Sequence, residues 1–231
     1  RLMDGEKRIA LDPRLSMIAE MVGRCSSYAD VGCDHGRLGA FLLQNGWVDR
    51  AVLTDISAPS LDKARALIRL LGLKERTKFV VCDGVDGLNE PVDAVVIAGM
   101  GGTTAAGIVE RGREKLGGAR LILQANVAIA ELRTRMESAG YRITDEHIAR
   151  DGRRHYIGIE ARPGAMALTE REAVIGPVLL QKRPAELGDY ARFRIRVAAK
   201  ALEGARKGGD AETAAALERE KRIWEDLEAC L

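Results

Sequence analysis

Two aspartates flank a glycine-rich stretch near the start of the chain. Residues 29–39 are Ala-Asp-Val-Gly-Cys-Asp-His-Gly-Arg-Leu-Gly, so Asp30 and Asp34 stand on either side of the first glycine. Glycines between a strand and a helix let backbone N–H groups and the helix N-terminus face a ligand. Acidic side chains there would repel the pyrophosphate of a dinucleotide, but they suit a ligand with an amino group and a sulfonium cation. These residue types therefore predict a site for S-adenosylmethionine.

Further carboxylates follow the next two predicted strands. Asp55 lies 19 residues beyond Gly36, close to the offset of about 20 residues at which an acidic side chain reaches the ribose hydroxyls in nucleotide-binding α/β folds. A solvent-exposed loop aspartate is the alternative. Asp83 would accept a hydrogen bond from the adenine amine of the cofactor, or it belongs to an Asp-Gly turn. The residues expected at the cofactor are Asp30, Gly32, Cys33, Gly36, Asp55, Ile56, Asp83, Gly84, Ala98 and Gly99.

A second glycine cluster, at residues 99–102 (Gly-Met-Gly-Gly), closes an apolar run. Its glycines would expose backbone groups and leave room for a flat base, or they allow a helix to pack closely on the strand. The side-chain amides of Gln124 and Asn126 could bond a base edge. His35 could orient the substrate or move a proton, or it makes a structural hydrogen bond. Asp34 alternatively caps the helix that follows. We expect the catalytic residues to be Asp34, His35, Gly99 and Asn126.

The elements that must position these residues alternate between strand and helix. Apolar residues at i, i+3, i+4 and i+7 predict a helix over residues 11–22. Strands are expected at residues 28–31, 50–56, 78–82, 92–98, 120–124, 141–148 and 155–161, and further helices at 38–43, 57–71, 102–116 and 128–139. Two strands without a helix between them end the series. This order resembles the class I methyltransferase fold, an α/β Rossmann-like sheet of seven strands whose last strand is antiparallel.

The composition changes after residue 163, where Ala, Arg, Glu and Leu become frequent. Helices are expected over residues 189–206 and 210–229, joined by a Gly-Gly-Asp turn into a coiled-coil-like hairpin. We therefore expect a cofactor-binding domain over residues 1–163 and a helical domain over 164–231. Residues 182–207 hold eight basic and three acidic side chains. This basic face could follow a phosphate backbone, or its charges form ion pairs between the two helices.

The overall composition limits the class of protein. The chain has 231 residues, 46% of them hydrophobic and 30% charged, with a net charge of +2, as expected of an ordered α/β domain with an appendage. No apolar run approaches the roughly 18 to 20 residues of a membrane helix, and no signal peptide is evident, so we expect a cytoplasmic protein. The four cysteines lack metal or CxxC spacing, which predicts reduced thiols and no metal; Cys33 and Cys82 would be small apolar fillers. Because the chain begins at Arg1, residues 1 to about 10 are expected to include the edge of a truncation or foreign residues.

Several of these runs together resemble one family. They are residues 29–36, 97–102 (Ile-Ala-Gly-Met-Gly-Gly) and 121–126 (Leu-Ile-Leu-Gln-Ala-Asn), with the pairs Arg14-Leu15, Ile18-Ala19 and Leu132-Arg133. They resemble the TrmK family of bacterial tRNA (adenine-N1)-methyltransferases, which act on adenosine 22 in the D arm. The resemblance extends from about residue 11 to the end of the chain. Cys33 stands where serine is expected, and Ala125, where proline is expected, would loosen the turn that bears Asn126.

The resemblance implies methylation of N1 of an adenine within tRNA. This nitrogen has a free lone pair in the neutral base, so positioning and electrostatics should supply most of the rate. An acceptor beside the exocyclic amine would stabilise the cationic product, with Asp34 the first candidate and the Gly99 carbonyl the second. The base must be exposed or flipped out, and the basic face of residues 182–207 would hold the tRNA.

Two other functions stay open from the sequence. One is a small-molecule N- or O-methyltransferase whose tail is a dimerisation hairpin. The other is a non-catalytic S-adenosylmethionine-binding module that acts through its helical arm. A monomer is favoured over a dimer, and neither a membrane nor a metal is expected as a partner.

Overall fold

The computed structural model describes residues 8–231, which form two compact units. The first extends to Met166 and the second is Ala167–Leu231. We call them the sheet unit and the helical unit, and each is described by itself. The expectation about residues 1 to 10 lies mostly outside the described residues.

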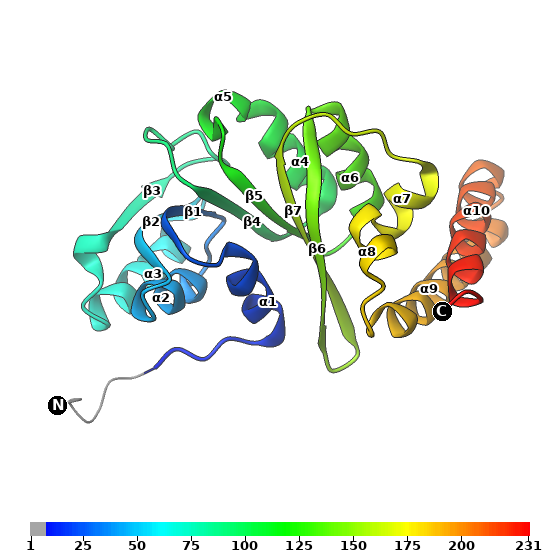
Figure 1. Cartoon of the computed structure of the whole chain (residues 1–231), viewed down its shortest axis with the longest axis horizontal. Helices are drawn as coiled ribbons and strands as arrows, with labels where there is room; N and C mark the ends of the chain where they lie inside the picture. Colours follow the sequence, from blue (N-terminus) through cyan, green and yellow to red (C-terminus); the bar gives the residue numbers. More distant parts are fainter. Residues whose placement is uncertain (1–7) are drawn as a thin grey trace. The chain divides into compact units, whose positions relative to one another are not determined.

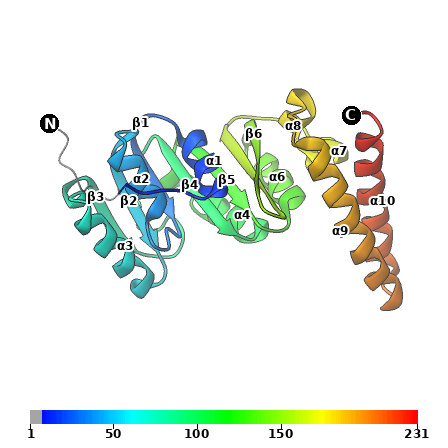
Figure 2. The same ribbon diagram turned by 90° about the horizontal axis from the view of Figure 1, so that it is seen from below.

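The sheet unit is built on seven strands in the order β3-β2-β1-β4-β5-β7-β6. The strands are β1 (Cys25–Val31), β2 (Val48–Asp55), β3 (Thr77–Val81), β4 (Ala94–Met100), β5 (Arg120–Ala125), β6 (Tyr141–Asp151) and β7 (Arg154–Pro163). The first five run parallel, and β7 is antiparallel to both of its neighbours. Figure 1 shows the strands and Figure 2 their order from β3 at one side to β6 at the other. The predicted class I methyltransferase fold is confirmed.

Helices cover both faces of this sheet. They are α1 (Pro13–Val22), α2 (Arg37–Gln44), α3 (Ala58–Leu70), α4 (Gly102–Arg111), α5 (Arg113–Leu116) and α6 (Ile129–Ser138), with a 3₁₀ turn η1 (Lys74–Arg76) before β3. The chain moves outward from β1 in opposite directions through β2 and through β4 and β5. Because crossovers between parallel strands are right-handed, α2 and α3 lie on one face and α4 and α6 on the other.

Local sequence signals explain where several of these elements begin. Asp12 accepts a hydrogen bond from the Leu15 backbone N–H at 2.8 Å, and Pro13 occupies the first helical position of α1. The first four residues of β4, Ala94 to Ile97, are fully buried, as expected of a central strand covered on both faces. These elements position the carboxyl ends of β1 and β4 side by side.

The β6–β7 hairpin is longer than the sequence predicted. Asp151 pairs with Arg154, so a two-residue turn joins the strands, whereas the prediction ended the first strand at Ile148. That prediction was wrong because the outer part of the hairpin is exposed on most of its length and shows little apolar alternation. Pairing between the two strands, rather than burial against a core, holds this segment in extended form.

The helical unit contains α7 (Glu170–Ile175), α8 (Pro177–Lys182), α9 (Leu187–Lys207) and α10 (Ala211–Glu228). The predicted hairpin of two long helices is confirmed, and the Trp224 ring on α10 packs edge-on against Tyr190 of α9 at 5.3 Å. The two short helices were not predicted. Thr169 and Glu172 form a capping box at the start of α7, a signal that the sequence did offer.

All four cysteines are free thiols in the structure. Over residues 8–231, no cluster of three or more His, Cys, Asp or Glu side chains could hold a metal ion. In the same residues, no helix is both long and apolar enough to cross a membrane.

Candidate active site

A cavity of about 280 Å³ opens at the carboxyl ends of β1 and β4. It is lined by Arg14, Leu15, Asp30, Gly32, Cys33, Asp34, His35, Arg37, Leu38, Ala98 and Gly99. The strand order reverses at β1, because β2 and β4 flank it and the chain then moves away on both sides. Open α/β sheets bind ligands at this point. Seven residues predicted at the site therefore do meet around one cavity: Asp30, Gly32, Cys33, Asp34, His35, Ala98 and Gly99.

The loop after β1 keeps its shape through backbone contacts. The N–H groups of Gly32 and Cys33 both donate to the Thr54 carbonyl at 2.9 Å. Gly36 has a φ of +67°, and a Cβ there would lie 2.8 Å from the Ala64 Cβ on α3. Glycine is therefore required at this position both for the left-handed backbone and for the close packing of α3.

Asp34 and His35 lie at the mouth of the cavity with exposed side chains. The Asp34 side chain is 74% exposed, and its Oδ1 lies 3.6 Å from the His35 Nε2. The Lys63 ammonium is 3.3 Å from the same ring nitrogen. The N-cap of α2 is Gly36, which has no side-chain cap. The helix-cap alternative for Asp34 is therefore wrong, and its carboxylate remains exposed beside the cavity.

Asp30 is a buried carboxyl group at the base of the cavity, with 6% of its surface exposed. Burial raises its pKa from 3.8 to about 7; the Arg14 guanidinium opposes this shift, and the Asp55 carboxylate adds to it. Near neutral pH this group is thus divided between its neutral and ionised forms. A positively charged ligand in the cavity would shift it toward the ionised form.

We expect the affinity for S-adenosylmethionine to depend on pH through Asp30. If the carboxylate binds the cofactor ammonium group, binding below about pH 7 requires loss of a proton, so affinity rises with pH and this contribution levels off above it. Calorimetry from pH 6 to 8.5, in buffers of different ionisation enthalpy, measures both the affinity and the released proton. Asp30→Asn should remove the proton release; an unchanged release in this variant would exclude Asp30 as its source.

Asp55 connects the loop to the start of α3. Its Oδ2 accepts a hydrogen bond from the Asp34 backbone N–H at 3.1 Å, and its Oδ1 accepts one from the Ser57 N–H at 2.8 Å. The alternative of a solvated loop aspartate is therefore wrong. Asp55 does not line the cavity, and its contact with a ribose stays a prediction.

Asp55→Ala is expected to weaken cofactor binding by about 10- to 100-fold, because hydrogen bonds to a charged group contribute about 1.5–3 kcal/mol each. Titration calorimetry with S-adenosylmethionine measures the loss. Asp55→Asn is the matched control, since its one remaining oxygen can still accept from one of the two N–H groups and should preserve part of the affinity. Wild-type affinity in Asp55→Ala would contradict the role of this residue.

The other predicted cofactor residues lie along the same edge but outside the cavity lining. Ile56 follows β2 and is 72% exposed. Asp83 follows β3 and lies 3.8 Å from the Arg111 guanidinium, and the Gly84 carbonyl accepts a hydrogen bond from the Thr54 hydroxyl at 3.3 Å. Their contacts with the adenosine half of the cofactor stay predictions.

A network of side-chain amides, from buried Gln124 and exposed Asn126, holds the second glycine cluster. Gly99 is an extra residue in β4, because Ala98 pairs with Gln124 and Met100 with Ala125. The Gln124 Oε1 accepts from the Gly99 N–H and from the Arg14 guanidinium, each at 3.2 Å. The buried Gln124 side chain is thus occupied within the protein and does not face a base edge.

Asn126 completes this network. Its Nδ2 donates to the Gly99 carbonyl at 3.0 Å, and its Oδ1 accepts from the Gln124 Nε2 at 3.2 Å. These contacts fix the Gly99 backbone, which has a φ of +79°. At Gly102, a Cβ would lie 2.2 Å from the Ala128 carbonyl oxygen. The close-packing explanation therefore holds for Gly102, whereas Gly99 opens toward the cavity.

Comparison with known proteins identifies the family of this chain. The family described as "Methyltransferase domain" matches residues 11–159. The tRNA (adenine(22)-N(1))-methyltransferase of Bacillus subtilis is 30% identical over 158 residues, which span 68% of this chain and 66% of that protein. A putative tRNA methyltransferase of Mycoplasma pneumoniae is 31% identical over 177 residues, which span 72% of this chain and 80% of that protein. The chain belongs to the TrmK family of methyltransferases.

Solved structures of the TrmK family extend the likeness to nearly the whole chain. A putative tRNA (m1A22) methyltransferase from Streptococcus pneumoniae superposes with a TM-score of 0.86 and 26% identity, covering 95% of this chain and 100% of that one. The complex of the same streptococcal protein with S-adenosyl-L-methionine gives a TM-score of 0.85 and 25% identity, with the same coverage. The family inferred from the sequence motifs is therefore confirmed.

The sequence missed four of the cavity residues: Arg14, Leu15, Arg37 and Leu38. Arg14 and Leu15 entered only as part of the TrmK motif, without a role. Arg14 reaches the site because α1 packs across β4, β5, β6 and β7. Its guanidinium lies 5.9 Å from the centre of the Tyr156 ring. No spacing rule within a strand-turn-helix unit links Arg14 and Leu15 to the glycine loop, so only the family motif could have indicated these two. Arg37 and Leu38 begin α2 directly after the loop, so their place in the sequence did offer a signal.

Proposed function

We propose that this protein methylates N1 of adenosine 22 in tRNA and takes the methyl group from S-adenosylmethionine. The observation that carries the proposal is the cavity at the ends of β1 and β4, where buried Asp30 and exposed Asp34 face the open Gly99 corner in a chain of the TrmK family. Such an enzyme works in the cytoplasm, where tRNA is modified.

The residues of the cavity fit the amino-acid half of the cofactor. Asp30 has a raised pKa and would hold the ammonium group, while the guanidinium of Arg14 would bind the carboxylate. Gly32 offers its backbone without a side chain. The volume of about 280 Å³ is at the lower limit of ligand pockets, which are about 300–1,000 Å³. We therefore assign the adenosine half to the neighbouring edge, where Asp55 ends β2 and Asp83 follows β3.

The protein's own contribution to the reaction would be positioning and charge. The bound cofactor supplies an electrophilic methyl group, and the adenine N1 lone pair needs no strong base. The Asp34 carboxylate would accept a hydrogen bond from the exocyclic amine and stabilise the positive charge that develops on the ring. The Gly99 carbonyl, which Asn126 holds in place, is the second candidate for this role.

The helical unit offers one set of tRNA contacts. Three basic residues of the face at 182–207 form ion pairs with acidic side chains of α9 and α10: Arg192 with Asp189 and Glu228, Arg194 with Glu220, and Arg206 with Glu218. Arg196, Lys200 and Lys207 are exposed and have no ion-pair partner among residues 8–231. Their spacing places them along one face of α9. We infer that this narrower stripe, rather than the whole basic face, contacts phosphates.

The test is methyl transfer from labelled S-adenosylmethionine into a tRNA transcript, followed by nucleoside analysis. The expected product is 1-methyladenosine. The matched control is the same transcript with guanosine at position 22, which should remain unlabelled. Equal labelling of both transcripts would contradict the assigned position. Labelling of small molecules alone would favour a small-molecule methyltransferase, and cofactor binding without any transfer would favour a non-catalytic module.

A further inference from the structure

We propose that the tip of the β6–β7 hairpin, through Arg153 and Arg154, binds the phosphate backbone of the tRNA beside the target adenosine. This inference rests on the proposed function and adds a substrate-binding arm to the sheet unit. It concerns residues to which neither the sequence motifs nor the cavity assigned a role.

The register of the sheet places this tip at the edge where the cavity opens. β6 runs parallel to β5, because both are antiparallel to β7. β5 ends at Ala125, which pairs with Ile157, while the β6–β7 pairing continues to Asp151 and Arg154. At about 3.3 Å per residue, Arg154 lies about 10 Å beyond the end of β5. The hairpin thus projects past the carboxyl ends of the parallel strands.

The base of the projecting part contacts a residue of the cavity. The Tyr156 ring lies under the Arg14 guanidinium, with 5.9 Å between them, and Arg14 lines the cavity. A Cβ at Gly158 would lie 2.4 Å from the Met21 sulfur, so α1 packs closely on β7 at this point. Arg154 is two residues before Tyr156 and therefore projects from the same face of the strand. This is the face that bears α1 and the cavity.

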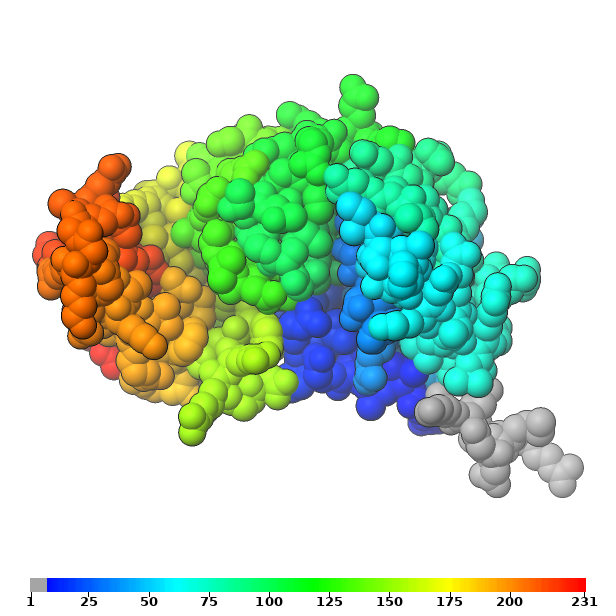
Figure 3. All heavy atoms as spheres, turned by 180° about the vertical axis from the view of Figure 1, so that it is seen from behind, coloured from blue at the N-terminus to red at the C-terminus, as the bar shows by residue number. Residues whose placement is uncertain are grey.

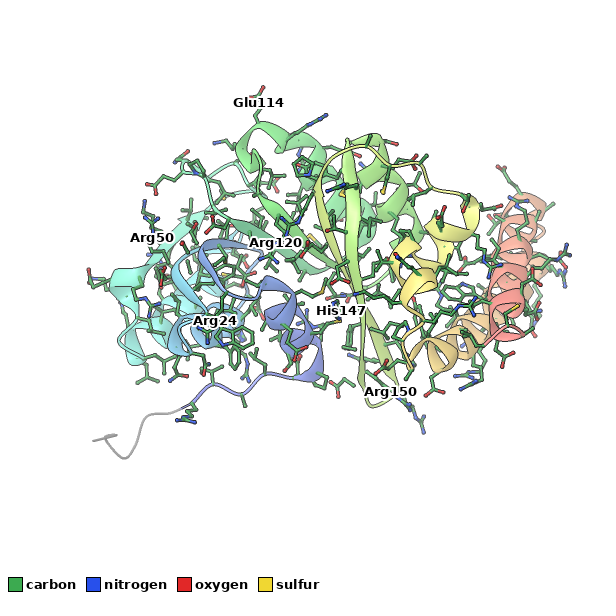
Figure 4. The ribbon with its side chains drawn as sticks, in the orientation of Figure 1. Arg24, Arg50, Glu114, Arg120, His147 and Arg150 are labelled. Carbon is green, nitrogen blue, oxygen red and sulfur yellow. The ribbon has the colours of Figure 1, made fainter. Side chains whose placement is uncertain are left out.

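The tip is basic and exposed. Residues 150–154 are Arg-Asp-Gly-Arg-Arg, and all five are exposed. Among residues 8–231, Arg153 and Arg154 have no ion-pair partner. Arg150 donates from its Nε to the Gly152 carbonyl at 3.0 Å. Figure 4 shows Arg150 at the tip of the hairpin, and Figure 3 shows the tip as a yellow-green lobe that projects from the surface.

Phosphate is the group that this arrangement fits. Guanidinium groups bind phosphate oxygens in a bidentate manner, and such contacts position a nucleic acid without reading its sequence. A base held at the mouth of the cavity, beside Asp34, brings its flanking phosphates to the rim, where an arm about 10 Å long can reach them. The two-residue turn and the continuous ladder hold the arm extended before the tRNA binds, which lowers the cost of ordering it.

The experiment measures the affinity of the full-length protein for a tRNA transcript at several salt concentrations. In Arg153→Gln/Arg154→Gln the dissociation constant should rise at least about 10-fold, and the slope of log affinity against log salt should fall by about two, one for each phosphate contact. The affinity for S-adenosylmethionine and the melting temperature should stay unchanged. Arg153→Lys/Arg154→Lys should lose less tRNA affinity than the glutamine variant, since the charges remain while the bidentate geometry is lost.

Arg24→Gln/Arg50→Gln is the matched control. Arg24 precedes β1 and Arg50 is the third residue of β2, so both lie toward the amino ends of these strands, away from the carboxyl ends where the cavity opens. Figure 4 labels both on the part of the sheet unit away from the hairpin tip. This variant loses the same charge and should bind tRNA within about twofold of wild type, since surface charges beyond a Debye length of about 10 Å are screened. Wild-type affinity in the hairpin variant, an equal loss in the control, or a loss in the lysine variant as large as that in the glutamine variant would overturn the proposal. If the wild type did not methylate tRNA but still bound it more tightly than the glutamine variant, the proposed function would be refuted and the binding role of the hairpin would stand.

Discussion

Asp34→Ala is expected to lower the turnover number of tRNA methylation by about 100-fold or more, while the affinity for S-adenosylmethionine changes by less than about threefold. Loss of a group that stabilises developing charge typically costs about 10²–10³ in rate. The Asp34 carboxylate is exposed, and the loop is held through its backbone N–H instead, which donates to Asp55 at 3.1 Å. The substitution therefore removes the charge without removing this contact.

Single-turnover kinetics at saturating cofactor and tRNA measure the effect on the chemical step. Asp34→Asn is the control that keeps an oxygen acceptor without its charge, and its rate should lie between those of wild type and Asp34→Ala. The His35 ring lies 3.6 Å from the Asp34 carboxylate. The variant His35→Gln therefore shows whether Asp34 acts on the substrate directly or through this ring. Equal rates in wild type and Asp34→Ala would exclude Asp34 from the reaction.

Glu146→Ala should lower the free energy of unfolding of the sheet unit by about 3–5 kcal/mol, the usual cost of removing one partner of a buried ion pair. The Arg133 Nε donates to the Glu146 Oε1 at 2.8 Å, and their side chains are 1% and 0% exposed. Arg133 lies on α6 and Glu146 on β6, so the pair joins a helix to the sheet. The variant keeps the buried guanidinium but loses the carboxylate that compensates its charge.

Urea unfolding measures the difference in the free energy of unfolding between wild type and Glu146→Ala. Two control variants test whether loss of the buried ion pair causes it. Glu110→Ala removes one of the two acidic partners of Arg135, in a pair near the surface, and should cost only about 0–1 kcal/mol. The double variant Arg133→Met/Glu146→Leu removes both charges and should recover much of the loss, since a well-packed apolar pair often replaces a buried ion pair without penalty. A loss as small in Glu146→Ala as in Glu110→Ala would show that the buried pair does not stabilise the unit.

Much of the fold follows from signals that lie within short segments. The apolar run of residues 94–97 predicted a central strand, and the Gly-Gly-Asp turn at 208–210 predicted the helical hairpin. Each signal depends on neighbours along the chain, through periodicity or a cap, and so it can be recognised without tertiary contacts. The short helices α7 and α8 were missed because six residues are too few to show a periodic pattern.

The sequence by itself determined the sheet, the glycine loop with its two acids, and the family. The tertiary structure alone decided what those residues touch. Arg14 meets Gln124 across 110 positions of the chain, Asp55 holds the Asp34 backbone, and the outer β6–β7 hairpin extends past the cavity edge. Such contacts depend on strand order, on register and on the path of α1 across the sheet. Residues so far apart in the sequence leave no local pattern that predicts their contact, because the contact geometry exists only once the chain has folded.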